Sequence, residues 1–145
     1  MKGCATMNVL VVDDQPSLRL LLATFLEDVG YRVSGVAHGR DALTSLHQSH
    51  ALPGLILLDI AMPVMSGWEF LSAQQGNRRI AMIPVVVMTA LADMTHDGAF
   101  PTVVAYLYKP LDLSRLTEVI AAHYRTPLQA KAVGAEYRRG VLMNE

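Results

Sequence analysis

The chain has 145 residues, of which 52% are hydrophobic and 17% are charged, and its formal net charge is −1. This composition excludes a globally disordered chain, predicts one domain with a short tail, and gives no overall attraction to nucleic acid or acidic lipid. The single cysteine, Cys4, excludes an internal disulfide. No apolar run approaches the roughly 20 residues of a membrane span. We therefore expect a cytoplasmic protein that does not enter the membrane.

Short apolar runs alternate with helical patterns from residue 8 to residue 124. The apolar runs are typical of strands buried on both faces, and they cover residues 8–12, 31–36, 55–58, 83–88 and 103–107. Helical spacing follows at residues 16–29, 39–48 and 68–75, and Asp112 is suited to cap a last helix. This alternation predicts an α/β fold with a doubly wound, five-stranded parallel sheet.

Residues 91–101 depart from the pattern of the other helices. The segment contains Gly98 and Pro101, which would interrupt a helix. We therefore expect a short or irregular fourth helix here. We assign residues 8–124 to the domain and residues 1–7 to an extension, and we predict a short extra helix in the tail at 125–145, where Thr126 begins a possible capping box.

Polar side chains stand where the predicted strands end. The first strand is followed by Asp13 and Asp14, the third ends in Asp59, the fourth in Thr89, and the fifth is followed by Lys109. Ligands of open parallel sheets bind at the carboxyl ends of the strands, so these side chains are expected to converge. Three carboxylates favour a bound cation, and ligands that are all oxygen favour Mg²⁺. A carboxylate beside Mg²⁺, an ammonium and a hydroxyl can accept a phosphoryl group.

Four motifs in chain order carry a resemblance to a known family. They are Val-Leu-Val-Val-Asp-Asp, Leu-Leu-Asp-Ile-Ala-Met-Pro-Val-Met-Ser-Gly, Val-Val-Met-Thr-Ala and Tyr-Leu-Tyr-Lys-Pro-Leu. Together they resemble the receiver domains of response regulators in bacterial two-component systems, in particular the single-domain chemotaxis type. The resemblance runs from about residue 8 to residue 124 and implies a flavodoxin-like fold with strand order 2-1-3-4-5.

The resemblance implies a role for each of the acidic residues. Asp59 corresponds to the phosphoacceptor, and Asp14 to an acidic Mg²⁺ ligand. Asp13 would act on the metal directly or through water. Asp59 would also bind the metal. The backbone carbonyl of Ala61 corresponds to a further metal ligand of the family.

The resemblance also implies a switch. The Thr89 hydroxyl would move toward the phosphoryl group, Lys109 would contact that group, and Tyr106 corresponds to an aromatic residue that changes rotamer. Pro110 would follow Lys109 through a cis peptide bond. The implied donor is a phosphohistidine on a sensor histidine kinase or a histidine phosphotransfer protein. The implied output is a downstream protein that binds the face formed by residues 90–124, and dimerisation through this face is an open alternative.

Three other interpretations remain open. A phosphatase with an aspartyl intermediate usually carries a second Asp two residues after the nucleophile, and Ala61 at that position disfavours an enzyme acting on outside substrates. A constitutive interaction module that is never phosphorylated is disfavoured by the complete set of acidic residues, Thr89 and Lys109. Finally, the chain could be a receiver cut from a larger regulator or hybrid kinase, although the tail favours a free-standing protein and is too short for a DNA-binding domain.

Overall fold

Five parallel strands form a single sheet in the computed structural model, which describes residues 7–90 and 100–126. The strand order is β2-β1-β3-β4-β5, so the predicted order 2-1-3-4-5 is confirmed. The strands are β1 (Asn8–Val12), β2 (Arg32–Val36), β3 (Leu55–Asp59), β4 (Val85–Thr89) and β5 (Val103–Tyr108).

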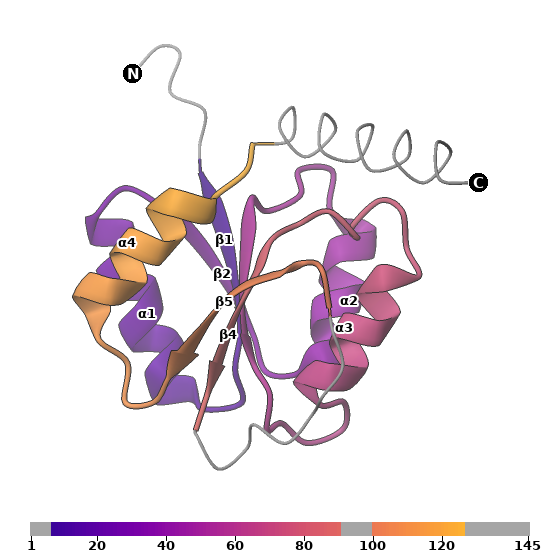
Figure 1. Cartoon of the computed structure of the whole chain (residues 1–145), viewed down its shortest axis with the longest axis horizontal. Coiled ribbons are helices and arrows are strands. Elements are labelled where there is room, and N and C mark those ends of the chain that lie inside the picture. Colours follow the sequence, from indigo (N-terminus) through magenta and orange to yellow (C-terminus); the bar gives the residue numbers. More distant parts are fainter. Residues whose placement is uncertain (1–6, 91–99, 127–145) are drawn as a thin grey trace.

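Helices cover both faces of the sheet (Figure 1). On one face lie α1 (Pro16–Asp28) and α4 (Leu113–His123), and on the other lie α2 (Gly39–Gln48) and α3 (Gly67–Gln75). Each face has its own hydrophobic cluster, with Leu22 and Leu116 on the first and Phe70 and Leu46 on the second. β3 and β4 are buried at every position, which explains why they consist of uninterrupted apolar residues before their polar ends.

Local signals explain where the helices begin and end. Pro16 occupies the first turn of α1, where its missing N–H is not needed, and Gly30 beyond its end has a positive φ of 108°. Asp112 caps α4 by accepting hydrogen bonds from the amides of Ser114 and Arg115, as the sequence predicted. Ser66 forms a capping box at the start of α3, which the sequence analysis did not anticipate.

The strand boundaries differ slightly from the predicted ones. β5 extends to Tyr108, whereas β2 begins at Arg32 and β4 begins only at Val85. The amide of Ile83 instead donates to the carbonyl of Ile80 in the preceding turn. The predicted short or irregular fourth helix, the extension up to residue 6 and the predicted tail helix from residue 127 lie outside the described residues. No described helix has the length and apolar character needed to span a bilayer.

Candidate functional site

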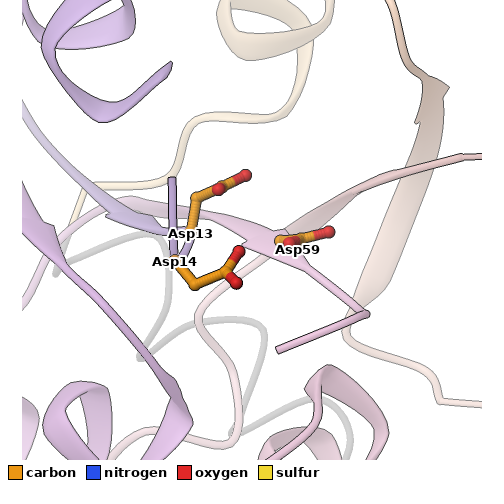
Figure 2. Close-up of side chains that lie close together, drawn as sticks. All are labelled: Asp13, Asp14 and Asp59. Carbon is orange, nitrogen blue, oxygen red and sulfur yellow. The ribbon is translucent and has the colours of Figure 1, made fainter. Parts of the chain in front are cut away.

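Three acidic side chains meet at the carboxyl ends of β1 and β3 (Figure 2). Asp13 and Asp14 follow β1, Asp59 is the last residue of β3, and one carboxylate oxygen from each lies within 4.8 Å of the others. Asp13 and Asp59 are buried, with 0% and 4% of their surface exposed, whereas Asp14 lies closer to solvent. The expected convergence of these three carboxylates is therefore observed.

Lys109 reaches this cluster from the end of β5. Its Nζ donates a hydrogen bond to Asp13 Oδ2 at 2.9 Å and lies 3.5 Å from Asp59 Oδ1. The backbone places it there, because the amide of Lys109 donates to the carbonyl of Thr89 at 2.8 Å. The peptide bond between Lys109 and Pro110 is cis, as the resemblance implied.

The electrostatics of the cluster favour an added cation. Burial and the neighbouring carboxylates of Asp13 and Asp14 raise the pKa of Asp59 from 3.8 to about 6, although Lys109 partly offsets them. Burial acts to lower the pKa of Lys109, but its hydrogen bond to Asp13 and the two nearby carboxylates outweigh burial and raise it. One ammonium does not neutralise three carboxylates, and a donor set made only of oxygen suits a hard divalent cation. The residues present therefore form an acidic pocket that fits a metal ion.

The two aspartates after β1 differ in how they are held. Both carboxylate oxygens of Asp13 have partners, since Oδ1 accepts from the amide of Gln15 at 2.8 Å and Oδ2 accepts from Lys109. The backbone amide of Asp13 also donates to the carbonyl of Val36. The carboxylate of Asp14 accepts no hydrogen bond from the part of the chain that the structure describes. Asp14 and Asp59 consequently have more free oxygen lone pairs than Asp13 for a metal.

The other predicted residues lie around the cluster with fewer contacts. Thr89 is fully buried one residue beyond Met88, the β4 partner of Asp59, and its hydroxyl donates to the carbonyl of Ala90 at 3.2 Å. Ala61 is exposed, two residues after Asp59. Tyr106 lies on β5 with 39% of its surface exposed. The metal contact of the Ala61 carbonyl and the switch roles of Thr89 and Tyr106 remain predictions.

Two residues at this edge were not identified from the sequence. Arg19 donates from Nη1 to the carbonyl oxygen of Asp13 at 2.7 Å. Gly67 packs so closely on the end of β3 that a Cβ there would lie 2.6 Å from the carbonyl oxygen of Asp59. The sequence placed Gly67 in the loop that follows Asp59, but it did not indicate a close contact with the Asp59 backbone. It placed Arg19 on the first helix, but it did not indicate a hydrogen bond to Asp13.

Comparisons with known proteins agree with this geometry. The family model of the response regulator receiver domain matches residues 9–121. Response regulator Rre1 of Synechocystis sp. is 36% identical over 118 residues, which cover 79% of this chain and 50% of the relative. Protein PilG of Pseudomonas aeruginosa is 31% identical over 129 residues, which cover 86% of this chain and 93% of PilG.

The solved structures give the same result. The crystal structure of a response regulator receiver protein from Pseudomonas putida has a TM-score of 0.71 and 29% identity, and the match covers 82% of this chain and 98% of that one. The chain spans half or less of the length of the first curated relatives that it matches. From the family match and the shared fold, the chain belongs to the family of response regulator receiver domains.

Proposed function

We propose that the chain is a signalling switch that accepts a phosphoryl group on Asp59 from a phosphohistidine of a sensor histidine kinase or a histidine phosphotransfer protein. The observation that carries the proposal is the position of Asp59. Its buried carboxylate lies at the carboxyl end of β3, with Lys109 Nζ 3.5 Å away and two further aspartates beside it. The proposed domain comprises residues 8–124, and its proposed location is the cytoplasm.

The proposed transfer is a displacement at phosphorus. A carboxylate oxygen of Asp59 forms the new O–P bond while the N–P bond of the phosphohistidine breaks, and its electron pair returns to the imidazole. Bound Mg²⁺ supplies positive charge that stabilises the equatorial phosphoryl oxygens. We propose Asp14, Asp59 and the Ala61 carbonyl as its direct ligands, with Asp13 acting directly or through water.

Lys109 and Thr89 complete the proposed site. The Lys109 ammonium already lies between Asp13 and Asp59, so a phosphoryl group on Asp59 would be within its reach. The Thr89 hydroxyl would leave the Ala90 carbonyl to donate to a phosphoryl oxygen. Tyr106 would then change rotamer, and the face formed by residues 90–124 would bind a downstream protein or a second copy with altered affinity. The phosphoryl group thereby biases two pre-existing states.

The competing functions make different predictions about the same site. A phosphatase would need a proton donor where Ala61 has only a methyl group. A constitutive interaction module would bind its partner with Asp59 never modified. The acidic cluster with its half-buried lysine supports the switch rather than either alternative.

Intact-mass analysis after incubation with acetyl phosphate and Mg²⁺ tests the proposal. We expect a phosphoryl adduct on the full chain that requires Mg²⁺, disappears in Asp59→Asn and persists in the exposed control Asp28→Asn. A folded protein that forms no adduct, under conditions that modify another receiver domain, would contradict the proposal and favour the constitutive module.

A further inference from the structure

The side chain of Arg19 spans from α1 to the end of β1. Its Nη1 donates to the carbonyl oxygen of Asp13 at 2.7 Å, across six positions of sequence. Its aliphatic stem runs past Gly35 of β2, where an added Cβ would lie 3.4 Å from Arg19 Cδ. No carboxylate of residues 7–90 or 100–126 forms an ion pair with Arg19. The guanidinium is therefore directed at a backbone oxygen and not at an acidic partner.

The carbonyl that Arg19 contacts belongs to the peptide that joins the two neighbouring aspartates. The carbonyl of Asp13 and the amide of Asp14 lie in one rigid plane, so a hydrogen bond to the first restrains the position of the second. Asp13 has three other anchors, through its amide and both carboxylate oxygens. The carboxylate of Asp14 has no hydrogen-bond partner among the described residues, so the backbone at this peptide determines where it points.

We propose that Arg19 is a positioning residue for the metal site, holding the peptide between Asp13 and Asp14 so that the Asp14 carboxylate faces Asp59. This inference rests on the proposed binding of Mg²⁺. Arg19 itself contacts neither metal nor phosphoryl group in this scheme and acts through the backbone. Gly35 lies beside the stem of Arg19, where an added Cβ would just touch Arg19 Cδ, so a larger branched side chain is needed to obstruct the stem.

The charge of Arg19 and its positioning role affect metal binding with opposite sign. A cation beside three carboxylates repels Mg²⁺, so removal of the charge alone would tighten Mg²⁺ binding. Loss of the hydrogen bond would instead let the peptide and Asp14 move, which weakens Mg²⁺ binding. The sign of the change therefore separates a positioning residue from a nearby charge.

Isothermal titration of the full chain with Mg²⁺, compared across four variants, tests the inference. We expect Arg19→Gln to weaken Mg²⁺ binding about tenfold, as outer partners of metal ligands commonly do, and Arg19→Lys to weaken it less. Gly35→Val retains the arginine but obstructs its stem, so it should also weaken Mg²⁺ binding. Arg40→Gln removes an equal charge from the first turn of α2 and should not weaken it.

Adduct formation with acetyl phosphate gives a second readout. For Arg19→Gln we expect the Mg²⁺ concentration at half-maximal rate to rise, while the rate at saturating Mg²⁺ approaches that of the wild type. Unchanged or tighter Mg²⁺ binding in a folded Arg19→Gln protein would overturn the inference. If that variant does not fold, unchanged or tighter Mg²⁺ binding in Gly35→Val would overturn it instead. A wild-type chain that binds no Mg²⁺ would instead refute the proposed function.

Discussion

The carboxylate of Asp59 is buried beside two other acidic side chains, and its ionisation therefore costs free energy in the metal-free folded protein. The pKa of Asp59 is raised from 3.8 to about 6, chiefly by burial and by Asp13. A raised pKa in an acid means that the folded state binds the proton more tightly than the unfolded state. The stability associated with this group therefore falls as the pH rises from about 4 to about 6, and it remains lost above that range.

Replacement of Asp59 by Asn should accordingly stabilise the metal-free protein at neutral pH. The pKa difference corresponds to up to about 3 kcal/mol in the free energy of unfolding at pH 7.5, because Asn carries no charge to bury. Urea denaturation in the presence of EDTA measures this, and the advantage of Asp59→Asn should shrink toward pH 4. An advantage of the same size at both pH values would contradict the electrostatic explanation.

At the scale of single elements, α4 depends on its first turn. Asp112 Oδ1 accepts hydrogen bonds from the amides of Ser114 at 2.9 Å and Arg115 at 3.2 Å, which would otherwise have no partner within the helix. The helix then buries Leu116 and Ile120 against the sheet. The cap therefore stabilises a helix that shares one face of the sheet with α1 (Figure 1).

We expect Asp112→Ala to lower the free energy of unfolding by about 1 kcal/mol, the usual cost of a lost N-cap. Ser114→Ala is the matched control, since it keeps the amide that Asp112 caps and removes a side chain in an exposed position. Urea denaturation of both variants provides the comparison. Equal losses in the two variants would show that the cap contributes nothing specific.

At the scale of the whole molecule, the end of α4 is tied to the amino-terminal edge of the sheet. The Tyr124 hydroxyl accepts from the amide of Asn8 at 2.8 Å, the Tyr124 ring lies 6.0 Å from that of Tyr31, and the amide of Arg125 donates to the carbonyl of Gly54 at 3.0 Å. These contacts join segments that are far apart in sequence. Gly54 permits them, because a Cβ there would overlap the Tyr124 ring and lie 2.5 Å from the Arg125 carbonyl oxygen.

Gly54→Ala should therefore destabilise the protein by about 1–3 kcal/mol, the usual range for overpacking. Gly76→Ala is the control, because its Cβ would make only an ordinary contact at 3.6 Å. Denaturation in a Tyr124→Ala background extends the test, since truncation of the ring should reduce the cost of Gly54→Ala. A cost that does not change in this background would show that the ring is not the obstacle.

Much of the fold and of the candidate site could be predicted because the relevant signals are local. The apolar run of β3 stops at Asp59, and β1 ends at Val12 directly before Asp13, so both the strands and their polar ends are visible in the chain. Gln74 had no such signal. It is fully buried, with Nε2 donating to the carbonyls of Ile80 and Ile83 and Oε1 accepting from Thr102, yet its neighbours in α3 do not distinguish it from a surface glutamine.

Within the described residues, the sequence by itself determined which segments form strands and helices, and that acidic, hydroxyl and ammonium groups follow those strands at the carboxyl edge of the sheet. Periodicity and strand ends are properties of neighbouring residues, and parallel strands necessarily share their carboxyl edge. Only the tertiary structure decided which atoms meet. Lys109 donates a hydrogen bond to Asp13, which lies 96 positions earlier in the sequence. Arg19 donates to the backbone carbonyl of Asp13 and not to a carboxylate. Such contacts depend on distances of a few ångströms, which the packing of helices on both faces of the sheet sets.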